Sequence, residues 1–116
     1  MAGAPGLERL KRRAEFLLAA SRGRKVASPG LVLQARHRAD DLPARFGFTV
    51  TKKVGNAVVR NRTKRRLREA ARLEMVEHPL RGVDLVLIGR EHTRSRRFAE
   101  LRADLRQALE RVGVAR

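Results

Sequence analysis

The chain has 116 residues, of which 28 are Lys or Arg and 12 are Asp or Glu, so that its formal net charge is +16 at pH 7. The absence of cysteine excludes disulfide frameworks, thiolate metal sites and cysteine nucleophiles. The 42% of hydrophobic residues can build one small core, while so large a positive charge favours encounter with polyanions such as nucleic acids.

The sequence shows no targeting or membrane segment. Residues 1–6 are small and predicted to be flexible, and no apolar stretch typical of a secretory signal precedes Arg9. No apolar run approaches the roughly 18 residues that a membrane span needs. We therefore expect a soluble, cytoplasmic protein with a single domain over residues 7–116.

The first predicted helix spans residues 7–20. Its apolar side chains recur at helical spacing and form one stripe: Leu7, Leu10, Ala14, Leu17 and Leu18. Phe16 projects about 180° from Leu7, beside Arg9, Arg12 and Arg13. An aromatic ring among arginines can stack on an unpaired base; the alternative is that Phe16 packs against another part of the core. Gly23 is predicted to end the helix as a left-handed cap.

Two strands are predicted next, at residues 31–37 and 45–53, joined by a polar loop over residues 38–44. In the second strand Phe46, Phe48 and Val50 alternate with smaller or polar residues and are predicted to face the core. The other face carries Gly47, Thr49, Thr51 and Lys53. These hydroxyls and the cation could lie under a phosphodiester chain; ordinary exposure to solvent is the alternative.

The most informative segment is a predicted helix over residues 57–77, with Asn56 as its N-cap and Pro79 beyond its end. Seven of the thirteen residues 60–72 are Arg or Lys, against one acid, Glu69. A sector of roughly 140° holds most of the polar residues: Arg60, Asn61, Lys64, Arg65, Arg68 and Arg72. The apolar side holds Val59, Thr63, Leu67, Ala70 and Leu73, with Arg62 and Arg66 at its margins.

This one-sided charge predicts contact with a nucleic acid. Each pair of like charges four residues apart destabilises a helix by a few tenths of a kcal/mol. A polyanionic partner would relieve that repulsion. A helix exposed only to solvent usually carries charges of alternating sign, which this segment does not.

A buried strand over residues 82–89, a basic loop over 92–97 and an amphipathic helix over 98–112 complete the predicted elements. The three histidines are scattered, with no spacing suited to a metal site. The carboxylates are few and mostly lie beside arginines, so that no general acid–base pair or activated nucleophile is visible. We expect that the chain breaks no bond with its own side chains.

The eighteen residues Lys52 to Glu69 closely resemble the signature of the bacterial ribonuclease P protein family. The centre of that signature is Arg60-Asn61-Arg62 followed by Lys64-Arg65, and the resemblance extends from Leu10 to Val112. It implies a compact α+β fold, a two-layer sandwich with the order α-β-β-β-α-β-α. It also implies a left-handed β-α-β crossover around the arginine-rich helix, against the general preference for right-handed ones.

The resemblance further implies a function. The family's protein joins a large catalytic RNA, and the two together remove the 5′ leader of precursor tRNA by endonucleolytic cleavage. Mg²⁺ ions held by the RNA carry the hydrolysis, and no cofactor is expected on the protein alone. The residues that match the family's RNA-subunit motif are Arg60, Asn61, Arg62, Lys64, Arg65 and Arg68.

The resemblance also points to a cleft that holds the single-stranded leader. The expected cleft residues are Arg9, Arg12, Phe16, Gln34, Thr49, Thr51 and Lys53. Two positions depart from the family pattern, since Ala20 and Gln34 stand where many relatives carry an aromatic residue. Base stacking is therefore expected to be weaker here and electrostatic attraction more important.

Three other functions agree with parts of the sequence. A small basic ribosomal RNA-binding protein would share the composition, a helix-turn-helix module would bind duplex DNA with the arginine-rich helix, and an autonomous nuclease would need a catalytic site. The strands on both sides of the helix disfavour the second function, so that we expect no DNA partner. We also expect no membrane partner, because no apolar run is long enough to span a membrane.

Overall fold

The computed structural model describes residues 7–114, so that the predicted flexible segment 1–6 lies outside the described residues. The strands are β1 (Glu8–Arg9), β2 (Arg24–Ser28), β3 (Leu31–His37), β4 (Arg45–Val50) and β5 (Val83–Gly89). The helices are α1 (Arg13–Arg22), the 3₁₀ helix η1 (Lys52–Val54), α2 (Ala57–Glu77), α3 (Glu91–Ser95) and α4 (Phe98–Arg111).

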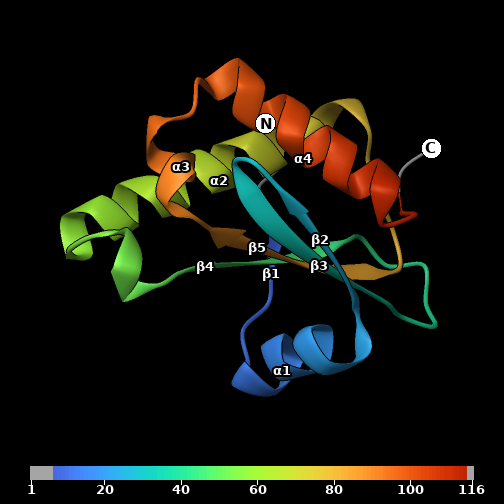
Figure 1. Ribbon diagram of the computed structural model, residues 1–116. Coiled ribbons are helices and arrows are strands. Elements are labelled where there is room, and N and C mark those ends of the chain that lie inside the picture. Colours follow the sequence, from blue (N-terminus) through green and yellow to red (C-terminus); the bar gives the residue numbers. More distant parts are fainter. Residues whose placement is uncertain (1–6, 115–116) are drawn as a thin grey trace, which may run out of the picture.

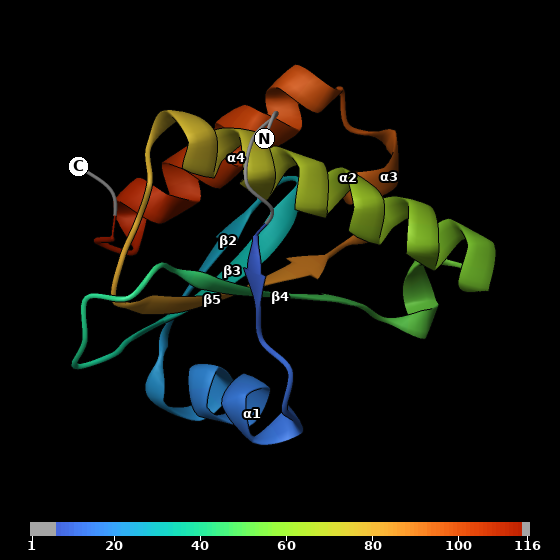
Figure 2. The ribbon, with the colours of Figure 1, turned by 180° about the vertical axis from the view of Figure 1, so that it is seen from behind.

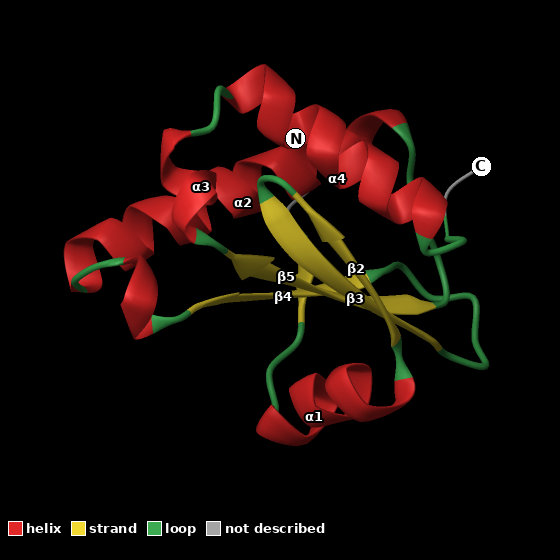
Figure 3. Cartoon of the chain, viewed as in Figure 1, coloured by secondary structure: helices red, strands yellow, loops and turns green. Residues whose placement is uncertain are grey.

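The five strands form one sheet in the order β1-β4-β5-β3-β2. Helices α2, α3 and α4 lie on one face of this sheet, and α1 lies alone on the other (Figure 1). Figure 3 shows the same division by type of element, with helices above and below the strands. The predicted α+β class and the predicted element order are confirmed, with β1 and α3 as short additions.

The connection between β4 and β5 sets the position of α2. These two strands are parallel neighbours, with Phe46 beside Leu85. The path from β4 through α2 into β5 turns in the left-handed sense, as Figures 1 and 2 show together, and as the family resemblance implied. Because most such connections are right-handed, this crossover is an unusual feature. It carries the N-terminal half of α2 beyond the end of β4.

The main core lies between the sheet and helices α2 and α4. Phe46, Leu67 and Leu85 are among its fully buried side chains. The predicted apolar side of α2 is confirmed by the burial of Thr63, Leu67 and Ala70. The hydroxyl of Thr63 stays satisfied at zero exposure, because it donates to the carbonyl oxygen of Val59 at 2.8 Å.

The predicted first helix begins six residues too early. It starts at Arg13, and β1 precedes it as a strand parallel to β4. The amide of Leu10 donates to the carbonyl of Phe46 at 2.9 Å, since the edge of β4 offers hydrogen-bonding groups that an extended segment can satisfy. The predicted apolar stripe is therefore wrong, and Leu17 and Leu18 are exposed.

Gly23 does not adopt the predicted left-handed conformation. Its φ of −88° and ψ of 174° are extended, because the chain continues directly into β2, a strand that the sequence pattern did not reveal. A Cβ atom at Gly23 would lie 2.4 Å from the carbonyl oxygen of Ala19. Close approach of the backbone, and not a positive φ, therefore requires glycine here.

Two further predictions need correction. The strand predicted over residues 45–53 ends at Val50, and Lys52–Val54 form η1 instead. Part of the predicted basic loop is the short helix α3. Near the start of α2, a 3₁₀ turn replaces the end of the predicted strand. Beside α2, a short helix replaces part of the predicted loop.

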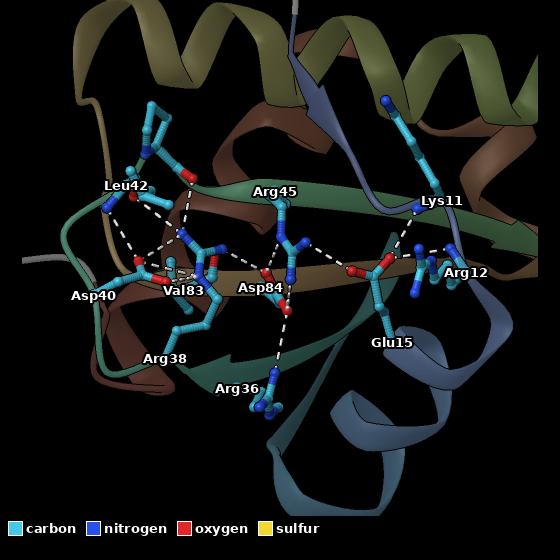
Figure 4. Close-up of polar contacts among 11 residues, drawn as sticks. Lys11, Arg12, Glu15, Arg36, Arg38, Asp40, Leu42, Arg45, Val83 and Asp84 are labelled. Carbon is cyan, nitrogen blue, oxygen red and sulfur yellow. Dashed lines mark hydrogen bonds and ion pairs between the residues drawn. The ribbon is translucent and has the colours of Figure 1, made fainter.

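A buried ion cluster joins the sheet to α1 (Figure 4). The side chain of Asp84 in β5 has no exposure and accepts hydrogen bonds from Arg36, Arg38 and Arg45. Arg45 donates to both carboxylate oxygens of Asp84 at 2.9 Å and also to Glu15 in α1 at 2.7 Å. Burial alone would raise the pKa of Asp84, but the hydrogen bonds from Arg45 and Arg38 outweigh it and lower that pKa.

We predict that Asp84→Asn lowers the free energy of unfolding by about 3–5 kcal/mol, because removing one partner leaves largely buried arginines without a counter-charge. Urea unfolding at neutral pH measures this change. The matched control is Asp41→Asn, which changes an exposed carboxylate and should have almost no effect. Equal unfolding free energies for the two variants would contradict the structural role of Asp84.

The same variant should alter the response to acid. A carboxylate with a lowered pKa stabilises the folded state above its unfolded pKa, here about 3.8, and loses that contribution as pH falls through the folded value. The free energy of unfolding of Asp84→Asn should therefore fall less steeply than that of the wild type below pH 3.8. Parallel curves in this range would show that Asp84 is not among the groups responsible.

Candidate nucleic-acid interface

The start of α2 is fixed by a local hydrogen bond. The side chain of Asn56 accepts from the amide of Val59 at 3.0 Å, which confirms the predicted N-cap. The helix ends at Glu77, as predicted, shortly before Pro79. Both ends of α2 therefore agree with signals in the adjacent sequence.

The predicted polar sector of α2 faces away from the core. We call Asn61, Arg62, Lys64, Arg65 and Arg68 the cationic face. Lys64 is half-buried and the other four are exposed, and none of its cations forms an ion pair within residues 7–114. Arg60 lies next to this face, and its Nη1 donates to the carbonyl of Gly55 at 2.9 Å. Arg72, also predicted for the sector, is neutralised by Glu69 at 2.6 Å.

Arg66 points elsewhere. Its guanidinium donates to the carbonyl oxygens of Thr93 and Arg96, at the C-terminal end of α3. These carbonyls have no partners within so short a helix, and a cation at a helix C-terminus is electrostatically favourable. Arg66 therefore joins α3 to α2 and is not part of the cationic face.

A second candidate surface lies on the opposite face of the sheet, beneath α1. Phe16 of α1 is half-buried and packs against Leu10, Ala19 and Val86. A Cβ atom at Gly47 would lie 2.3 Å from Cε2 of Phe16, so that the ring rests directly on the backbone of β4. The prediction that Phe16 lies opposite the packing side of its helix is thus wrong, although the ring remains partly exposed.

Strand register shows which other predicted residues share this surface. Thr49 pairs with Ile88, and Gln34 pairs with Val86, so that both lie on the α1 side of the sheet and are half-buried. Ile88 also packs against the cluster that contains Phe16. Phe16, Gln34 and Thr49 are therefore brought together on one face.

The remaining predicted cleft residues lie apart from this face or at its rim. Arg9 pairs with Phe46 and lies on the core side of the sheet, with its guanidinium carbon 5.3 Å from the ring centre of Phe48. Arg12 is the exposed N-cap residue of α1. Thr51 and Lys53 are exposed but follow the end of β4, so that no strand geometry fixes their direction.

The apolar floor of this surface was not predicted. Val32 and Ile88 are half-buried neighbours on the α1 side of the sheet. Ile88 ends a long apolar run and Val32 lies in the short apolar run 31–33, and in both runs the residues of the two faces look alike. Only the strand register, in which Ile88 pairs with Val32 and with Thr49, shows that these residues lie on the α1 side.

Within residues 7–114 we find neither a metal-binding cluster nor a membrane-spanning helix. Residues 7–114 contain no group of three or more His, Asp or Glu residues placed to hold a metal ion. None of the helices described is long and apolar enough to cross a membrane.

Comparison with known proteins gives one consistent family. A family model described as Ribonuclease P matches residues 5–113. The chain is 72% identical over 106 residues to the ribonuclease P protein component of Gluconacetobacter diazotrophicus, and 91% of each chain is covered. It is 52% identical over 112 residues to the protein of the same name from Paramagnetospirillum magneticum, covering 93% of this chain and 84% of that one.

Solved structures agree with the sequence comparison. The RNase P protein from Thermotoga maritima is 32% identical, with a TM-score of 0.76 over 90% of this chain and 96% of that chain. The RNase P protein of Staphylococcus aureus is 28% identical, with a TM-score of 0.78 over 93% and 97% of the two chains. The similarity therefore extends through the whole fold and is not limited to the arginine-rich segment.

We predict that Gly47→Ala destabilises the protein by about 1–3 kcal/mol, because the added methyl group would overlap the Phe16 ring. The measurement is the free energy of unfolding in a double-mutant cycle with Phe16→Ala. In the Phe16→Ala background, Gly47→Ala should cost much less, since the obstructing ring is gone. Additive losses would mean that the two residues do not touch.

Proposed function

Because the chain belongs to the Ribonuclease P family of protein components, which act in tRNA processing as part of a ribonucleoprotein, we propose that it binds two RNA ligands. One is the catalytic RNA of ribonuclease P. The other is the single-stranded 5′ leader of precursor tRNA. In this role the protein assists endonucleolytic removal of the leader, which produces the mature 5′ end.

The observation that carries the proposal is the unpaired charge of the cationic face. Elsewhere on α2 and α4, arginines meet carboxylates: Arg72 pairs with Glu69 and Arg106 with Glu74. Arg62, Arg65 and Arg68 have no such partner within residues 7–114. Clustered unpaired arginines suit phosphates, because each guanidinium presents several donors in a fixed plane, and binding releases counterions from the RNA.

The surface beneath α1 supports leader binding. A partly exposed aromatic ring, two half-buried polar residues and an apolar floor suit a strand whose bases are unpaired, because every base offers a flat face for stacking. The surface has one ring, Phe16, since Ala20 and Gln34 are not aromatic. Exposed cations beside it, including Arg12 and Lys53, would attract the backbone of the leader.

We assign the hydrolysis to the RNA subunit and its Mg²⁺ ions. The cationic face is mostly positive and would repel a divalent cation, and residues 7–114 hold no group of three or more His, Asp or Glu residues placed to bind one. The role of this chain is therefore to bind and position RNA. The family match also disfavours the alternative of a ribosomal RNA-binding protein, which would leave the leader-binding surface without a use.

We predict that replacing Arg62 and Arg65 together by Ala weakens binding to a bacterial ribonuclease P RNA without changing the thermal stability of the protein. Each phosphate contact that the two substitutions remove should reduce the slope of log affinity against log salt concentration by about one unit. The matched control is Arg81→Ala with Arg111→Ala, which removes two exposed arginines far along the chain. If both double variants bind equally well, the cationic face is not the RNA-binding surface.

We also predict that Phe16→Leu weakens binding of precursor tRNA to the assembled enzyme by roughly fivefold, the low end for one stacked base. Leucine keeps the apolar packing of Phe16 and removes the aromatic ring. Mature tRNA lacks the leader, so that its affinity serves as the internal control and should not change. Equal losses for precursor and mature tRNA would assign Phe16 to packing alone.

A further inference from the structure

Helix α3 has only five residues, yet both of its ends are fixed. At its start, the buried hydroxyl of Thr93 accepts from the amide of Arg90 at 2.7 Å and donates to the carbonyl of Gly30. At its end, Arg66 of α2 donates to two carbonyl oxygens. These contacts hold the helix in one position beside the N-terminal half of α2.

This placement brings Arg94 of α3 to the turn that precedes α2. Nη1 of Arg94 lies 3.4 Å from the carbonyl oxygen of Val54, and Nη1 of Arg60 lies 2.9 Å from that of Gly55. Two guanidinium groups from distant parts of the sequence therefore converge on consecutive residues. Each carries five N–H donors and uses one of them in the contact described.

The charge of this pair is not balanced nearby. Neither Arg60 nor Arg94 forms an ion pair within residues 7–114, whereas Arg96, two residues after Arg94, is held by Asp104 at 2.7 Å. Each of the two groups contacts a carbonyl oxygen of the same turn, and a carbonyl oxygen carries only a partial negative charge, which does not neutralise a guanidinium group. An anion with several acceptor oxygens would satisfy the remaining donors of both groups.

We propose that Arg60 and Arg94 together bind one phosphate group of an RNA backbone, so that α3 is a second RNA-contact element beside the cationic face. The proposal rests on the function proposed above. It assigns Arg94 a role in binding and Arg66 a role in positioning α3. The phosphate belongs either to the catalytic RNA or to the 5′ leader, and the experiment distinguishes these two sources.

The central variant is Arg94→Ala, and Arg111→Ala is its matched control. Both arginines are exposed, and each donates one hydrogen bond to a backbone carbonyl, that of Val54 or that of Ala27. The variants therefore lose the same charge and the same kind of intramolecular hydrogen bond. Arg94→Gln is a second variant that removes the charge while keeping an N–H donor on a shorter side chain.

Two affinities are measured for each variant over a range of salt concentrations: that of the protein for a bacterial ribonuclease P RNA, and that of the assembled enzyme for precursor and mature tRNA. Arg94→Ala and Arg94→Gln should weaken one of these affinities about tenfold, as expected for one charged hydrogen bond. Loss of RNA assembly assigns the phosphate to the catalytic RNA. Loss confined to precursor tRNA assigns it to the leader. Arg111→Ala should change neither affinity.

A double-mutant cycle tests the sharing of one phosphate. If Arg60 and Arg94 hold the same group, the double variant should bind less weakly than the product of the two single effects predicts, and its salt slope should fall by about one unit and not two. Fully multiplicative effects with a slope change of two would overturn the shared site.

The failure of this inference is distinguishable from failure of the proposed function. If Arg94→Ala binds both RNAs as tightly as Arg111→Ala does, while the Arg62 and Arg65 variant is impaired, α3 is not an RNA-contact element and the proposed function stands. If neither the Arg94 variant nor the Arg62 and Arg65 variant loses affinity, both proposals are wrong.

Discussion

The ion cluster around the buried carboxylate of Asp84 is the interaction on which the arrangement of the surface beneath α1, the proposed leader-binding surface, depends. It draws Arg36, Arg38 and Arg45 together from β3, the loop after it and β4. Arg45 also forms an ion pair with Glu15 of α1. Since α1 otherwise rests on the sheet through few apolar side chains, this ionic link helps to fix the distance and direction of the helix. The position of the Phe16 ring over Gly47 follows from it.

Charge is distributed unevenly over a molecule with a net charge of +16. The carboxylates Glu74, Asp84 and Asp104 are buried and neutralise arginines that support the fold. Within residues 7–114, the cations of the cationic face and those of Arg60 and Arg94 are left without such partners. A protein that needed only solubility would gain from mixing the two signs. The separation seen here leaves like charges next to one another on one surface, and binding of a phosphate backbone would relieve their repulsion.

How much of this could be read from the sequence differed between elements for physical reasons. The limits of α2 were predicted because Asn56 and Pro79 act on the adjacent backbone. The orientation of α1 was not, because Leu7 and Leu10 fit a helical spacing but lie in an extended segment beside β4. Strand β2 was missed because most of its residues are exposed and polar or small. The partners of Asp84 and the approach of Arg94 to Val54 join residues about 40 or more positions apart, which no local pattern reveals. Arg9 was predicted to lie in the first helix and to line the leader-binding cleft, whereas the pairing of β1 with β4 places it on the core side of the sheet.

We propose that this chain enables a catalytic RNA to process precursor tRNA and supplies no bond-breaking group itself. The most direct measurement is the rate of precursor tRNA cleavage at low Mg²⁺ concentration by a bacterial ribonuclease P RNA, by the purified chain, and by the two together. We expect efficient cleavage at the mature 5′ end only for the combination. Cleavage by the chain freed of all RNA, or a combined rate no higher than that of the RNA alone, would contradict it.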